Sequence, residues 1–289
     1  MRPLSRYLLR RHVVPFCLAF GGLTGFMLVN QLNKQAPRVF GKGLPGSEIV
    51  QVFALSVPFI VAVVLPLAVL VAVLRVFTRL AADPEIVAMA TGGGRVGVMP
   101  LIAPVLGAAA CVALLAFLMS DQVLPRTNHR LRTLQVAIER PSSPAPESYK
   151  SDREMTTSEL RQAARSAREE ADRAGADGRQ AIELAARQRA AAFEVEIQKK
   201  YALSAACLVF AFFGASVGLR FQRRGVALVI GVSSGVFVLF YVTLIGGEEL
   251  GDRLIESPFV AMWTANLVLG AIGLLVLWRV MQRGWSVRA

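Results

Sequence analysis

The chain has 289 residues, of which 54% are hydrophobic and only 18% are charged, and its formal net charge is +12. An ordinary soluble domain is excluded, because such a domain carries about a quarter of charged residues. The three cysteines fall in three different apolar stretches, and neither histidine has a Cys, His or acidic partner at ligand spacing. We therefore expect no disulfide framework, no metal and no cofactor.

Charged residues are absent from six stretches: 13–33, 49–74, 96–120, 201–219, 225–247 and 257–278. Each can cross about 30 Å of hydrocarbon, which takes roughly 20 helical residues. Buried helices of a soluble protein would alternate with amphipathic ones, and the first stretch is longer than the core of a signal peptide. The predicted fold class is an all-α membrane protein with six transmembrane helices in two three-helix blocks and a short helical periplasmic insertion.

The short connections between these stretches differ in charge. Arginines dominate four of the terminal and connecting segments: Arg2, Arg6, Arg10 and Arg11; Arg75, Arg79 and Arg95; Arg220, Arg223 and Arg224; Arg279, Arg283 and Arg288. The fifth connection is acidic instead, with Glu248, Glu249, Asp252 and Glu256. The positive-inside rule therefore predicts that both termini are cytoplasmic.

The first block, residues 1–123, begins with a span that contains the pair Gly21 and Gly25. The same four-residue spacing recurs as Gly214 and Gly218 in span four and as Gly231 and Gly235 in span five. Glycines at this spacing let helix backbones approach closely. The spacing fits packing against a partner helix and packing within the chain equally well.

A short helix is predicted over residues 83–92, between spans two and three. Asp83 can cap it, Pro84 suits the first helical position, and Glu85 favours the positive end of the helix dipole. Such a helix at the cytoplasmic face fits either a docking element for a soluble partner or an interfacial re-entry.

The segment 124–200 changes composition twice. Residues 141–148 form a Pro/Ser linker. Thr156 and Glu159 then form a predicted capping box that starts a helix. Residues 175–178 interrupt this helix, and a second helix from about Arg179 runs into span four, where the second block, 201–289, begins. The apolar residues of the first helix are mostly alanine, so we expect it to bury little.

Basic residues also gather at the predicted outer face, against the positive-inside trend. They follow span one and span three: Lys34, Arg38 and Lys42; Arg126, His129, Arg130 and Arg132. Arg and Lys hold phosphate oxygens by charge-assisted hydrogen bonds, so these residues are candidates to bind an anionic lipid. The alternative is that they only snorkel to phospholipid headgroups.

The six stretches contain no ionisable residue that could carry protons or activate a nucleophile. Thr91 to Arg95 lacks the Gly-Lys-Ser/Thr ending of a phosphate-binding loop. We therefore expect no enzyme activity in this chain. Any ATP hydrolysis that drives transport belongs to a separate cytoplasmic subunit.

Four motifs occur in a fixed order along the chain. They are Leu65-Pro66-Leu67 with Arg79-Leu80-Ala81-Ala82-Asp83-Pro84-Glu85; Val123-Leu124-Pro125-Arg126-Thr127-Asn128; Met155-Thr156-Thr157-Ser158-Glu159-Leu160; and Trp263-Thr264-Ala265-Asn266. In this order and spacing the chain resembles the LptF/LptG (YjgP/YjgQ) permeases of the bacterial lipopolysaccharide exporter, over nearly its whole length.

The resemblance implies an inner-membrane permease subunit of an ATP-driven exporter that extracts lipopolysaccharide laterally for transport to the outer membrane. Its implied partners are a second LptF/LptG-type permease, an LptB-type ATPase dimer and an LptC-type membrane-anchored periplasmic protein, with no nucleic acid. It implies ATPase coupling through Asp83, Glu85, Ile86 and Met89. It also places Gly21, Gly25, Gly231 and Gly235 in spans that line lateral gates.

One departure from the family is expected. Members carry a periplasmic β-jellyroll between spans three and four, and eight short strands with turns need roughly 80 to 100 residues. Residues 124–154 are too few, so the jellyroll is predicted to be missing and lipid to pass to the partner permease. Two rival functions stay open: a permease of another ABC lipid or lipoprotein exporter, and a non-transporting membrane scaffold.

Overall fold

The computed structural model describes residues 2–39, 46–82, 99–139, 150–221, 225–252, 254 and 256–282. In these ranges the chain is helical and contains no strand. Six stretches are long and apolar enough to cross a membrane. They belong to α1 (Arg2–Val39), α2 (Gly46–Ala82), α4 (Met99–Leu118) with its continuation, α7 (Gln180–Arg220), α8 (Gly225–Asp252) and α9 (Pro258–Gln282). The predicted all-α membrane fold is confirmed.

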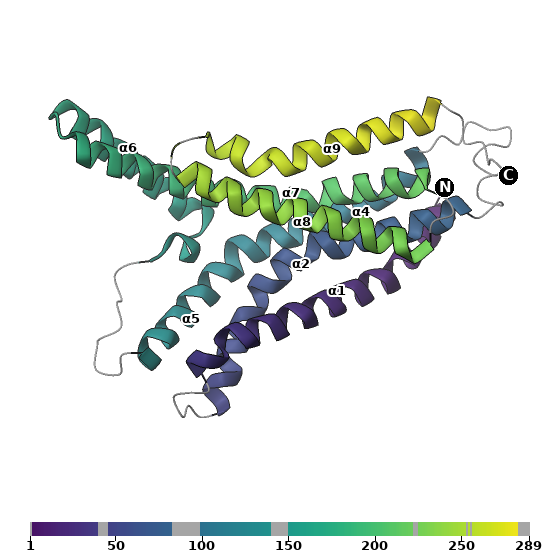
Figure 1. Ribbon diagram of the computed structural model, residues 1–289, viewed down its shortest axis with the longest axis horizontal. Helices are drawn as coiled ribbons and strands as arrows, with labels where there is room; N and C mark the ends of the chain where they lie inside the picture. The colour runs from purple at the N-terminus through teal and green to yellow at the C-terminus, as the bar shows by residue number, and fades with distance from the viewer. Residues whose placement is uncertain are drawn as a thin grey trace.

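Helices α2 and α7 form the centre of the bundle (Figure 1). Leu70 and Leu74 of α2 share a buried apolar cluster with Phe210 and Phe213 of α7. Helix α7 also packs against α4 and α9, so it joins the two three-helix blocks into one body. Helices α1 and α8 lie at the periphery and leave much of their apolar surface open.

The third span continues well past residue 120, where the uncharged stretch ends. A π-helical turn η2 (Met119–Val123) follows α4, and α5 (Leu124–Glu139) follows the turn without a break. Asp121 lies in the turn and finds polar partners there, as described below. The charge of Asp121 therefore ends the apolar stretch without ending the helix.

The helix α6 (Thr157–Ala176) begins as predicted. Thr156 is its N-cap, and both hydrogen bonds of the capping box with Glu159 are present. The chain then reverses at Gly178, whose φ of 70° is a left-handed conformation that favours glycine, and α7 begins after Arg179. The expectation that α6 buries little was wrong. Its small side chains let α6 approach α7 closely, and four alanines form a buried ridge together with Leu160: Ala164, Ala167, Ala171 and Ala174.

Candidate functional site

The site lies at the end of the bundle opposite the start of α1 and the end of α9, where spans three, four and five meet the segment that returns to span four. We call it the distal polar cluster. Its members are Asp121, His129, Arg132, Arg153, Glu154, Glu196, Lys199, Lys200 and Glu248.

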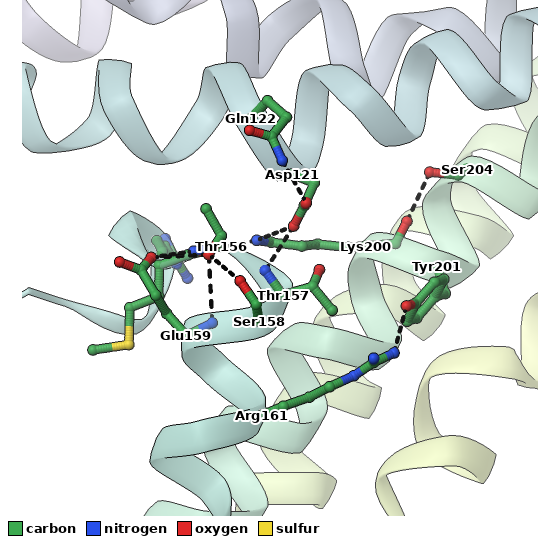
Figure 2. Close-up of polar contacts among 12 residues, drawn as sticks. Asp121, Gln122, Thr156, Thr157, Ser158, Glu159, Arg161, Lys200, Tyr201 and Ser204 are labelled. Atoms are coloured by element: carbon green, nitrogen blue, oxygen red, sulfur yellow. Dashed lines mark hydrogen bonds and ion pairs between the residues drawn. The ribbon is translucent and has the colours of Figure 1, made fainter.

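Asp121 connects span three to the start of α6 and to α7. Its Oδ1 accepts a hydrogen bond of 2.6 Å from the backbone amide of Thr157, and the Lys200 Nζ lies 3.6 Å from the same oxygen (Figure 2). The π turn changes the helical register, so Asp121 faces α7. Such turns are rare in helices and occur frequently at functional sites.

Lys200 is the most enclosed cation of the cluster, with a side chain 4% exposed. Besides Asp121, it donates a hydrogen bond of 2.7 Å to the carbonyl oxygen of Met155. A buried ammonium is stable only when it is paired and hydrogen-bonded, and both conditions are met here. Lys200 therefore ties α7 to the return segment and to span three at once.

A second ionic group holds the return segment against α5. Glu154 in the short 3-10 helix η3 (Asp152–Glu154) is 4% exposed. Its carboxylate lies 3.0 Å from His129 Nδ1 and 3.3 Å from Arg132 Nη1. Asn128 donates to the carbonyl oxygen of Arg153 at 3.0 Å. The extension of span three beyond the π turn is thereby fixed to the chain that leads into α6.

Glu248 connects α8 to the same cluster. Its Oε1 lies 2.9 Å from Arg153 Nη2 and 3.3 Å from Lys199 Nζ, and Lys199 also bonds Glu196 at 2.8 Å. The nearby Gly251 of α8 lies against Val195 of α7. The distal end of α8 is therefore locked, although its middle is open.

The motif Trp263-x-x-Asn266 has a visible role in pinning α9 to α7. Trp263 Nε1 donates to Gln198 Oε1 at 3.0 Å, and Asn266 Nδ2 donates to the carbonyl oxygen of Ala202 at 2.8 Å. Both donors reach the turn of α7 that carries Lys200. Three of the four motifs seen in the sequence therefore converge on the distal polar cluster.

The predicted lipid-binding residues lie in three situations. Arg126, His129 and Arg130 share one face of α5; the two arginines are exposed, whereas His129 is engaged by Glu154. Lys34 and Arg38 lie in the last turns of α1, which runs alongside α2. Lys42 is outside the described residues, as are the predicted coupling residues Asp83, Glu85, Ile86 and Met89.

The glycine pairs divide into two kinds. A Cβ on Gly218 would lie 2.7 Å from Phe77 Cβ, so the Gly214/Gly218 pair packs against α2 within the chain. By contrast, a Cβ on Gly21, Gly25, Gly231 or Gly235 would meet no atom of the described residues within 4 Å. These four glycines of α1 and α8 therefore face away from the other described helices.

Sequence reasoning missed most of the distal polar cluster, above all Asp121. A signal was available: Asp121 ends one apolar stretch and Lys200 precedes another, and with two spans crossing antiparallel both fall at the same membrane face. The convergence of Glu154 and Glu248 had no such signal, because it depends on the path of the return segment.

The polar side chains of the distal polar cluster are paired with one another. No group of three His, Cys, Asp or Glu side chains among the described residues could hold a metal. Each acid of the cluster is paired with a cation, and Asp121 also accepts a hydrogen bond from a backbone amide, which stabilises the packing of the helix ends. With six helices long and apolar enough to cross a membrane, the fold defines a multi-pass membrane protein.

Comparison with protein families gives the family. The family described as Lipopolysaccharide export system permease LptF/LptG matches residues 6–151 and 138–279, which together span nearly the whole chain. The chain belongs to the LptF/LptG family. A comparison with curated proteins gave no match.

Proposed function

We propose that this permease takes lipopolysaccharide laterally from the inner membrane as one of two LptF/LptG-type subunits of an ATP-driven exporter. The observation that carries the proposal is the unequal packing of the spans. In the most apolar stretch of α1, 6% of the residues are buried, and in that of α8, 17% are buried. In the most apolar stretch of α7, the share of buried residues is 78%. Two spans with open glycine faces are suited to line a gate with a second permease.

Substrate contact is assigned to the basic residues at the distal end. Arg126 and Arg130 are exposed on α5, and Lys34 and Arg38 lie on the last turns of α1. The phosphates of lipopolysaccharide carry the charge that these side chains complement. The positive-inside pattern makes this end periplasmic and both termini cytoplasmic.

Energy is proposed to enter at the opposite end, where an LptB-type ATPase dimer docks on residues 83–92. This segment follows directly after α2 in the sequence. In the most apolar stretch of α2, 67% of the residues are buried. A movement at the end of α2 is therefore transmitted to α7 and the rest of the bundle, since packed helices move together. The described residues of this chain contain no strand, so lipid is proposed to pass to the partner permease and an LptC-type protein to receive it.

The test uses the full chain in its complex. We expect Arg126→Ala and Arg130→Ala each to weaken photocrosslinking to lipopolysaccharide, and its stimulation of ATP hydrolysis, about ten-fold, because a charge-assisted contact is removed. Arg279→Ala, which removes an exposed charge at the other end of the bundle, is the control and should change neither readout.

The outcomes separate the rival functions. Equal crosslinking in all three variants would refute the assignment of phosphate contact to Arg126 and Arg130. Mass spectrometry of the co-purified lipid distinguishes lipopolysaccharide from a lipoprotein or another lipid. A complex that lacks any ATPase would leave only a membrane scaffold.

A further inference from the structure

A second basic site lies at the other end of the bundle from the distal polar cluster, between the start of α1 and the end of α2. It is a pocket of about 330 Å³. The residues that line it are Arg11, Val14, Pro15, Leu18, Arg75, Val76 and Arg79. Its volume lies at the lower end of the range for small-ligand sites, which is about 300–1,000 Å³.

The charge of this pocket is uncompensated within the described chain. Three of its lining residues are arginines and none is acidic. No carboxylate of the described residues forms an ion pair with Arg11, Arg75 or Arg79. Arg75 is half-buried, and the Arg11 guanidinium lies 4.5 Å from the centre of the Tyr7 ring, which restricts its position. Guanidinium groups held together in this way favour a shared anion.

The rest of the pocket is apolar and continues along α1. Val14 is 64% exposed and Leu18 is 70% exposed. The two residues are four apart, so they lie on the same face of the helix and extend from the arginines toward the middle of the span. A ligand that fits both halves has an anionic head and a hydrocarbon chain.

We propose that this pocket binds an anionic phospholipid of the leaflet on that side. Its phosphate is held by Arg11, Arg75 and Arg79, and one acyl chain lies along Val14 and Leu18. Basic pockets between helices on the cytoplasmic side of a membrane suit such headgroups, whereas a snorkelling arginine needs no pocket and no arginine neighbours. The site does not depend on the proposed substrate contact, because it lies at the end of the bundle opposite Arg126 and Arg130.

The test is lipid titration of the purified full chain in detergent, followed by native mass spectrometry. Phosphatidylglycerol and phosphatidylcholine with the same acyl chains are compared. We expect phosphatidylglycerol to bind at least ten-fold more tightly. Arg11→Gln, Arg75→Gln and Arg79→Gln should each weaken it about ten-fold, since each removes a charge-assisted contact. Arg279→Gln, at the same end of the bundle on α9, is the matched control and should bind like the wild type.

Arg11 and Arg79 are exposed, so their variants carry the test even if Arg75→Gln fails to fold. Equal binding of the two lipids would overturn the proposal, as would variants that behave like Arg279→Gln. A large excess of inorganic phosphate or glycerol 3-phosphate should leave the bound phosphatidylglycerol in place. Displacement by either would mean that the pocket takes a soluble phosphate compound and would overturn the lipid assignment.

Discussion

Helices α7 and α1 are both apolar enough to cross a membrane, and they are packed in opposite ways. Helix α7 contacts α2, α4, α6, α8 and α9. The space beside its glycines Gly214 and Gly218 is occupied by atoms of α2. Helix α1 contacts mainly α2, and its glycines open outward. Hydropathy alone therefore indicates that a helix can cross the membrane, whereas packing decides whether the helix lies at the centre of the bundle or at its periphery. Helix α8 resembles α1 in its middle and α7 at its distal end.

The largest effect on the free energy of unfolding is expected at the ion pairs of the distal polar cluster. Lys200→Met should lower the free energy of unfolding by about 3–5 kcal/mol, because it leaves the Asp121 carboxylate enclosed without its cation. Chemical unfolding in detergent measures the loss. Lys150→Met, which breaks an exposed pair with Glu159, should cost about 1 kcal/mol or less. Equal losses in the two variants would contradict the central role of Lys200.

The next largest difference in stability is expected between a glycine that packs within the chain and one that does not. Gly218→Ala should destabilise by about 1–3 kcal/mol, because the new methyl meets Phe77 Cβ and the backbone nitrogen of Thr78 at 2.7 and 3.1 Å. Gly231→Ala meets no atom and should be neutral or stabilising by up to about 1 kcal/mol. Thermal unfolding of the two variants makes the comparison. A stable Gly218→Ala protein would show that α2 and α7 are not rigidly packed.

Larger side chains at the open glycines test whether these faces have a partner. Gly231→Leu should preserve stability but reduce co-purification of the second permease, because it fills a surface that is open in this chain. Leu239→Ala, at an exposed residue of the same helix, is a size-reducing control. Unchanged assembly in Gly231→Leu would assign the glycine face to lipid contact only.

A smaller effect is expected at the start of α6. Thr156→Ala removes the N-cap hydrogen bond to the Glu159 amide and should cost about 1 kcal/mol. Thr133→Ala removes a hydroxyl that only bonds the carbonyl oxygen of His129 within α5, and it should change stability by no more than about 0.5 kcal/mol. Unfolding monitored by circular dichroism should separate the two variants. Indistinguishable curves would contradict the capping role.

The smallest effect depends on pH. The Lys150 ammonium, followed by the Thr156 amide, lowers the pKa of Glu159 from 4.5 to about 2. Because the folded value lies below the unfolded one, Glu159 stabilises the protein above about pH 4.5. That contribution is lost as the pH falls toward about 2. Glu159 is exposed, so screening limits it to about 1 kcal/mol or less. The difference in thermal stability between wild type and Glu159→Gln should shrink from pH 5 to pH 3, and a constant difference would refute the linkage.

The sequence by itself determined the number of spans, because burying uncharged stretches of about 20 residues in lipid is the dominant energy term. It also determined the capping box at Thr156, since this motif needs only residues three apart. The family followed from four motifs in order. These features are local or additive along the chain.

Only the tertiary structure decided which glycines pack and which stay open, because Gly218 and Gly231 have the same spacing and neighbours of the same kind. It also decided that Asp121, Glu154 and Glu248 converge. Their pairing depends on a π turn and on the path of the return segment, which bring charges from distant parts of the chain within hydrogen-bond distance. In a membrane protein such enclosed charges must find partners, but the sequence does not say which ones.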